Sequence, residues 1–177
     1  MKIKAELLDS IGIERALRRI AHEIIETNKG VNNLVLLGVV RGGVPICEQL
    51  AKNIAHIEKI KVPTGKLDIT EYRDDKDFLD LSDKVRVSEI DFSLQDKDVI
   101  LCDNVLFTGR SVRAAIEGII KLGRPRSIQL AVLIDRGHRE LPIRADYVGK
   151  NVPTSREEVV QVIFDDVDGN RAVILEK

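Results

Sequence analysis

The chain has 177 residues, of which 44% are hydrophobic and 32% charged, so it predicts one globular domain of ordinary size. Its net charge of -1 excludes a global attraction to nucleic acid or anionic membranes, and the 3% content of aromatic residues argues against a base-stacking platform for single strands. The sequence has neither an apolar run of the ~18 residues that a membrane span needs nor a signal-peptide pattern, so we expect a cytoplasmic protein without membrane contact.

The first elements predict a short edge strand over residues 1–8 and then a helix over residues 10–28, with Ser10 as its cap. The apolar residues of that helix recur every three or four positions, which indicates one buried face. The other face carries four basic residues: Arg15, Arg18, Arg19 and His22. Taken alone, this cationic stripe is either a solvated helix face or part of a binding surface.

A second strand-to-helix unit follows over residues 34–57. Residues 34–40 read as a buried strand, and Arg41, Gly42 and Gly43 lead into a helix. The two glycines let the backbone approach an anion closely, although the segment could be only a tight turn. Cys47 in this helix and Cys102 in a later strand fit small core residues better than metal ligands or a disulfide.

The next segment is highly charged. Residues 66–72 alternate like a strand and residues 85–90 fit a second one, which together predict a hairpin. The residues between them, about 73–84, have little to bury. They could form a mobile lid over a site or a surface insertion.

The most informative stretch is Val99–Ser111, with the sequence VILCDNVLFTGRS. Its apolar start predicts a buried strand, and Asp103 and Asn104 at the strand end can accept hydrogen bonds from sugar hydroxyls. The turn that follows leads onto a helix predicted over residues 111–122, whose first N–H groups suit a phosphate. The order of these parts describes a site for ribose 5-phosphate, although the turn could be only a strand-to-helix connection.

The remaining elements complete an α/β pattern. Residues 128–134 read as a buried strand followed by polar residues, and shorter strands are expected at 147–149, 159–164 and 172–175. Strands that alternate with helices predict a central, mostly parallel sheet with helices on both faces. The loops that follow residues 40, 102 and 134 should then meet at the carboxyl edge of the sheet.

These motifs carry a resemblance to a known family. Val99–Ser111 resembles the phosphoribosyl diphosphate (PRPP) signature of type I phosphoribosyltransferases. The segments 16–30, 68–75, 99–115 and 122–155 are similar to the pyrimidine-operon attenuation regulators, which are also uracil phosphoribosyltransferases. The resemblance implies a single phosphoribosyltransferase domain over residues 1–177, with a lid at about 73–90 and a small hood.

The same resemblance implies the reaction of uracil with PRPP to give UMP and diphosphate, with Mg²⁺ as cofactor. The catalytic pair would be Asp103 and Asn104, and Asp103 would also meet Mg²⁺, which is held largely through the substrate. The 5-phosphate would be bound by Thr108, Gly109, Arg110 and Ser111, and the diphosphate by Arg41, Gly42 and Arg73. The residues implied around the base are Val105, Leu106, Asp135, Arg136, Gly137 and His138.

Asn104 departs from the family signature, which has two adjacent acids at this point. An amide still bonds a ribose hydroxyl, but it adds no negative charge beside a cationic transition state. Losing such a contact can cost on the order of 10²-fold in rate. The sequence therefore leaves open a nucleotide-sensing regulator with weak or lost catalysis, and also a phosphoribosyltransferase for another base.

The second implied role is binding of pyrimidine-operon leader RNA, with UMP or UTP as co-ligand. The residues at the matching positions are Arg19, His22, Arg139, Arg144 and Lys150, and Arg18 adds a cation where the family commonly has threonine. Binding through phosphates should weaken with salt. The family also implies a homodimer or homotetramer.

Overall fold

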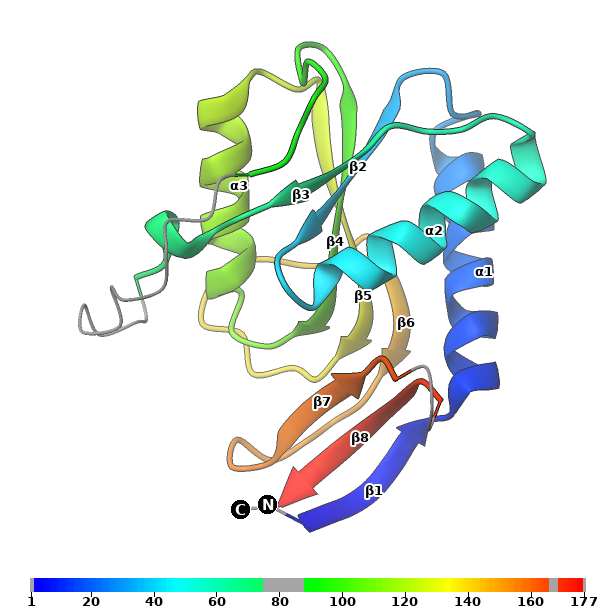
Figure 1. Cartoon of the computed structure of the whole chain (residues 1–177). Helices are drawn as coiled ribbons and strands as arrows, with labels where there is room; N and C mark the ends of the chain where they lie inside the picture. The colour runs from blue at the N-terminus through cyan, green and yellow to red at the C-terminus, as the bar shows by residue number, and fades with distance from the viewer. Residues whose placement is uncertain (1, 75–87, 166–168, 177) are drawn as a thin grey trace.

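The computed structural model describes residues 2–74, 88–165 and 169–176. Within these residues the strands form two sheets (Figure 1). The main sheet has the order β3-β2-β4-β5-β6, with bounds Thr64–Leu67, Leu34–Val39, Asp98–Leu106, Ser127–Asp135 and Tyr147–Asn151. The small sheet has the order β1-β8-β7, with bounds Lys2–Leu8, Arg171–Glu176 and Val159–Ile163.

Every neighbouring pair in the main sheet is parallel, which confirms the predicted sheet. All residues of β2 are buried, as a central parallel strand covered on both faces requires. The parallel arrangement brings the carboxyl ends of β2, β4 and β5 to one edge. The three predicted loops therefore do meet there, and Figure 1 shows the small sheet lying beyond the same edge.

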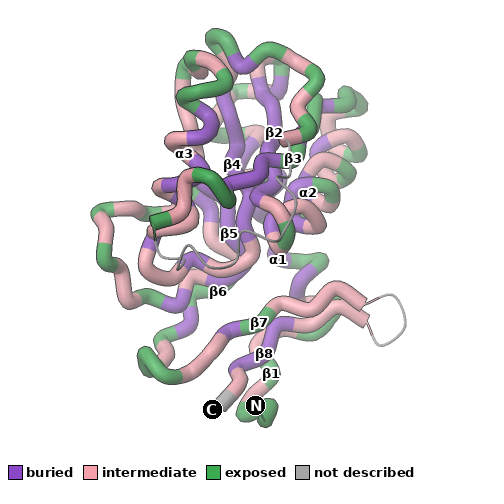
Figure 2. Tube along the Cα trace, turned by 60° about the vertical axis from the view of Figure 1, so that its left-hand side comes forward, coloured by how far each residue is buried: buried purple, intermediate pink, exposed green. Residues whose placement is uncertain are grey.

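Helices cover both faces of the main sheet, and the strands between them are mostly buried (Figure 2). Helices α1 (Ser10–Thr27) and α2 (Gly43–Glu58) lie on one face, and α3 (Arg110–Leu122) lies on the other. The predicted apolar stripe of α1 is buried, and its four basic residues are exposed. In α3, Ile120 belongs to the apolar pattern of the helix, but the residue is 62% exposed.

Several predicted boundaries need correction. The cap of α1 is Asp9, whose carboxylate accepts from the Gly12 N–H at 2.7 Å, while Ser10 is the first helical residue. Strand β4 continues through Leu106, so the polar residues 103 and 104 lie inside a strand that we expected to end before them. Helix α3 begins one residue early, at Arg110.

The predicted hairpin of residues 66–72 with 85–90 is only partly present. Strand β3 ends at Leu67, and a short 3-10 turn, η1 (Thr70–Tyr72), replaces its expected continuation. A single antiparallel bridge joins Lys66 to Glu89. Most of the expected lid at 73–90 lies outside the described residues.

Two further expectations concern the core and membranes. Cys47 and Cys102 are both buried free thiols, as predicted. No helix in the described part of the chain combines the length and hydrophobicity that crossing a membrane requires.

Candidate functional site

The carboxyl edge of the main sheet brings the predicted acceptors against the glycine turn at residues 41–43. A Cβ atom on Gly42 would lie 2.2 Å from the amide nitrogen of Asn104, and one on Gly43 would lie 2.1 Å from the carbonyl oxygen of Cys102. A larger residue at position 43 would have to move the turn away from the backbone of β4, and one at position 42 would have to displace the Asn104 side chain. The glycines therefore seat this turn, which we call the diphosphate loop, directly on β4.

Asp103 supplies a buried carboxyl group at this point. One of its oxygens accepts from the Asn104 N–H at 2.8 Å, and the side-chain oxygen of Asn104 accepts from the Val105 N–H at 2.8 Å. Burial raises the pKa of Asp103 to about 6, against the opposing effects of the Asn104 hydrogen bond and the charge of Arg73. Arg73 therefore lies within electrostatic reach of the carboxyl group.

The turn at Thr108–Ser111, which we call the phosphate loop, has the form expected of an anion site. Gly109 adopts a left-handed conformation with φ of 93°, and α3 starts behind it without a side-chain cap. The Arg110 N–H donates to the Thr108 hydroxyl at 3.3 Å, and the following N–H groups of the first helical turn lie at the positive end of the helix dipole. The predicted phosphate residues are adjacent in this loop.

Arg110 in the phosphate loop has two acidic neighbours that the sequence did not predict. Its guanidinium group donates to Glu140 at 2.8 Å and to Asp74 at 3.0 Å. Asp74 is the second residue of the expected lid, so an ion pair joins the start of that segment to the phosphate loop.

The residues expected around the base separate into two groups. Val105 and Leu106 pair in register with Ile134 and Asp135, so β4 brings them beside the start of residues 135–138, which we call the base loop. Leu106 is only 1% exposed and packs in the core beneath α3. Its side chain is therefore not available to a base, and its carbonyl already accepts from the Arg136 N–H at 3.1 Å.

The side chains of the base loop point to other parts of the protein. Arg136 donates to the Thr154 hydroxyl at 3.0 Å and to the Ser155 carbonyl at 2.7 Å, and a His138 ring nitrogen contacts the Thr154 carbonyl. The Asp135 carboxylate accepts from the Gly137 N–H at 3.0 Å. The loop is thus tied to residues 152–158, which connect β6 to β7 and which we call the connecting loop.

The basic residues expected to bind RNA also divide by their contacts. Arg19 of α1 donates to the carbonyls of Val148 and Gly149 on β6, at 3.1 and 2.7 Å. Arg139 donates to the Phe107 and Ile143 carbonyls, both at 2.9 Å, and pairs with Asp135.

The other basic residues of this set make fewer hydrogen bonds to the rest of the protein. Arg18 pairs with Glu14 on the surface of α1 at 3.0 Å, and Lys150 donates to the Leu7 carbonyl at 2.9 Å. His22 and Arg144 are exposed. The structure thus places all of these residues near α1, β6 and the base loop, but Arg19 and Arg139 hold backbone segments together as well.

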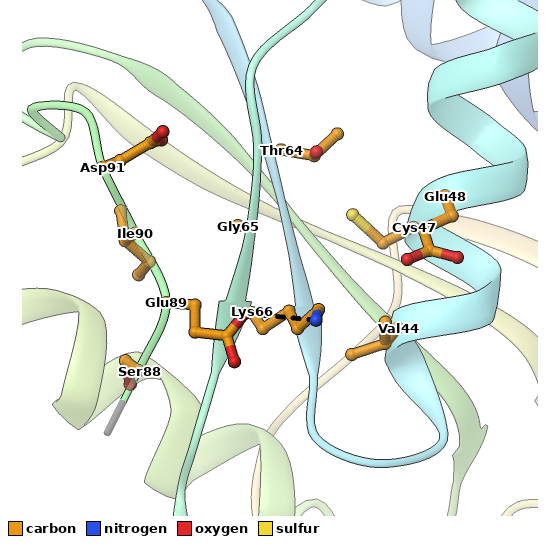
Figure 3. A pocket seen from close by; sticks show the side chains of 10 residues that line it. All are labelled: Val44, Cys47, Glu48, Thr64, Gly65, Lys66, Ser88, Glu89, Ile90 and Asp91. Carbon is orange, nitrogen blue, oxygen red and sulfur yellow. Dashed lines mark ion pairs between the residues drawn. The ribbon is translucent and has the colours of Figure 1, made fainter. Parts of the chain in front are cut away.

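A cavity of about 470 Å³ lies away from this edge, between α2, β3 and residues 88–91 (Figure 3). Its lining contains the ion pair of Lys66 with Glu89 at 3.1 Å, and none of the predicted site residues. The cavity is therefore distinct from the candidate site.

The donor set agrees with a metal that arrives with its substrate. Among the described residues, no group of three or more His, Cys, Asp or Glu side chains is placed to hold a metal ion. Mg²⁺ commonly uses one or two carboxylates together with substrate phosphates. The single carboxylate of Asp103 beside two anion-binding loops suits that mode.

A family model for the phosphoribosyl transferase domain matches residues 4–167. The chain belongs to this family. It is 56% identical over 174 residues to a protein of Clostridioides difficile, with 98% of each chain covered. It is 61% identical over 174 residues to one of Pelotomaculum thermopropionicum, with 98% of this chain and 96% of the relative covered. Both relatives are named bifunctional protein PyrR.

Solved structures of this family share the fold. A hypoxanthine phosphoribosyltransferase of Trypanosoma cruzi matches with a TM-score of 0.74 and 22% identity, covering 98% of this chain and 92% of that chain. A hypoxanthine-guanine phosphoribosyltransferase of Bacillus anthracis matches with a TM-score of 0.67 and 20% identity, covering 86% of this chain and 85% of that chain. At these identities the likeness confirms the predicted fold alone.

Proposed function

We propose that this protein is a bifunctional pyrimidine-operon regulator that also transfers a phosphoribosyl group from PRPP to uracil. One observation carries the catalytic half: Asp103 and Asn104 lie against the diphosphate loop, and the same strand leads directly into the phosphate loop. The 56% identity to the Clostridioides difficile relative over nearly the whole chain supports the regulatory half. The proposed roles also imply a cytoplasmic location, since nucleotide synthesis and transcription occur there.

In the proposed reaction the chain binds, orients and neutralises, and needs no protein nucleophile. Asp103 and Asn104 accept hydrogen bonds from the ribose hydroxyls, while the N–H groups of the phosphate loop hold the 5-phosphate. The ionised carboxylate of Asp103 stabilises positive charge that develops on the ribose, and Arg41 and Arg73 stabilise the leaving diphosphate. Asp103 would be the protein contact of Mg²⁺, and the metal would supply charge neutralisation of the diphosphate.

The catalytic half is tested by measuring UMP formation from uracil and PRPP with Mg²⁺. We expect turnover with uracil and none with hypoxanthine, the base named for the fold neighbours. Turnover with hypoxanthine but not with uracil would show that the substrate is a purine base. No product with either base, together with retained UMP binding, would favour the nucleotide sensor without catalysis.

The regulatory half is tested by a mobility shift with the leader RNA of the organism's own pyrimidine operon. We expect binding that UMP strengthens and that rising salt weakens. His22 and Arg144 are the residues to replace by alanine, because both are exposed. Lys52→Ala on the exposed face of α2 is the matched control. Binding that none of these changes alters, or no binding at low salt, would remove the RNA role.

The proposed assembly is a homodimer or homotetramer. Light scattering of the purified protein should give a mass of two or four chains. A monomer at micromolar concentration would contradict it.

A further inference from the structure

Arg136 is a buried cation between the base loop and the connecting loop. Its side chain follows β5 directly, and the residue is only 5% exposed. The guanidinium group donates to the Thr154 hydroxyl and to the Ser155 carbonyl, and the Thr154 hydroxyl donates back to the Arg136 carbonyl at 3.3 Å. Three hydrogen bonds therefore join one residue of the base loop to two neighbouring residues of the connecting loop.

The same guanidinium group is also supported from the side of β4. Its carbon lies 4.0 Å from the centre of the Phe107 ring, which meets the His138 ring edge-on at 5.9 Å. Phe107 directly precedes the phosphate loop. The cation is therefore clamped between an aromatic face on the main sheet and polar groups on the chain that leads into the small sheet.

The electrostatic surroundings show that this arrangement is costly. No carboxylate among the described residues forms an ion pair with Arg136, and burial lowers the pKa of its guanidinium group while the charge of Glu158 opposes the shift. Glu158 itself pairs with Lys4 on β1 and accepts from the Ser155 N–H at 2.8 Å. Burying a cation this way is unfavourable unless its hydrogen bonds are satisfied, so the contacts to Thr154 and Ser155 must persist.

We propose that Arg136 is a positioning residue for the base. Its guanidinium group holds the connecting loop, and with it the small sheet, against the base loop, so that the two loops form the walls of the base site. This inference rests on the proposed function. It replaces the direct contact with the base that the sequence implies, because two nitrogens of the guanidinium group donate to Thr154 and Ser155.

The test compares Arg136→Lys, which keeps the charge but not the two-pronged geometry, with Thr154→Val, which removes one acceptor and keeps the shape. Arg156→Ala, at an exposed position of the same loop, is the control. We expect both variants to raise KM for uracil by about tenfold, to leave KM for PRPP within about twofold, and to be non-additive when combined. Hydrogen exchange of residues 152–158 should become faster in both variants and stay unchanged in the control.

Two results would overturn the proposal. A raised KM in Arg136→Lys with normal kinetics in Thr154→Val would show that Arg136 contacts the base itself. Unchanged exchange of residues 152–158 in both variants would show that the guanidinium group does not hold the loop. If Arg136→Lys does not fold, Thr154→Val alone tests the proposal, through KM for uracil and the hydrogen exchange of residues 152–158. If the wild-type protein forms no UMP, the proposed function fails while hydrogen exchange still judges the role of Arg136.

Discussion

Asp103 is the residue on which catalysis depends in this account, and its environment opposes its ionised form. Burial raises its pKa to about 6 in the protein without ligand. In the proposed reaction, ribose hydroxyls and Mg²⁺ would favour the ionised form, so substrate binding would stabilise a charge that burial destabilises. Asn104 beside it contributes an acceptor without charge.

The pH dependence of stability tests this state of Asp103. A pKa near 6 lies above the ordinary value of an unfolded chain, so the protonated carboxyl stabilises the fold. That contribution is complete below about pH 4 and is lost as the pH rises through 6. The free energy of unfolding should fall by at most ~3 kcal/mol over this range. Urea unfolding between pH 4 and 7 should show this loss in the wild-type protein and not in Asp103→Asn. An equal change of the free energy of unfolding with pH in both proteins would contradict the prediction.

Asn104→Asp restores the second acid of the family signature. Because an ionised carboxylate stabilises the positive charge that develops on the ribose, we expect kcat to rise by on the order of 10- to 10²-fold. Steady-state rates of UMP formation at saturating uracil and PRPP measure it, with Asn104→Ala as the control that removes the acceptor. An unchanged rate in Asn104→Asp would show that the missing charge does not limit turnover.

At the scale of elements, hydrophobic periodicity predicted the helices and the buried strands well. It failed where backbone pairing continues through polar residues: β4 remains paired with β5 from Asp103 to Leu106, although Asp and Asn disfavour strands. The prediction that the strand continues after Leu67 was wrong, because β3 has only a single bridge to another segment on its outer side. Pairing of this kind depends on residues far along the chain, and local sequence does not show it.

The close approach of the diphosphate loop to β4 gives a prediction about an element. In Gly43→Ala the new Cβ would meet the backbone of β4, which cannot move aside. We expect a loss of ~1–3 kcal/mol in stability and a weaker affinity for PRPP. Val44→Ala, at the next position of α2 and without new atoms, should retain PRPP affinity. Denaturant unfolding and PRPP titration of both variants provide the measurement, and a wild-type result for Gly43→Ala would contradict the packing.

At the scale of the whole molecule, the sequence located the three loops that meet at the carboxyl edge but not the contacts that hold them together. The sequence predicted Arg136 and Arg139 as ligand-binding residues. Nothing in the neighbouring sequence shows that they donate to Thr154, Phe107 or Ile143. Such contacts depend on the tertiary fold. Side chains expected at a functional surface thus prove to join distant segments.

This dual use gives a prediction for the basic surface. Arg19→Ala removes donors to two carbonyls of β6, and each lost hydrogen bond should cost ~0.5–1.5 kcal/mol. Arg144→Ala, at an exposed position, should leave stability unchanged. Thermal unfolding of both variants beside their RNA mobility shifts separates binding from folding. Equal stability of the two variants would contradict the structural role of Arg19.

The central claim is that the carboxyl edge around Asp103 binds a phosphoribosyl group. Calorimetric titration of PRPP in the presence of Mg²⁺ tests it most directly. We predict saturable binding to the wild-type protein and to Lys52→Ala, and an affinity at least about tenfold weaker in Asp103→Ala, because hydrogen bonds to a charged acceptor are lost. No binding of PRPP to the wild-type protein, or equal affinity in Asp103→Ala, would contradict the claim.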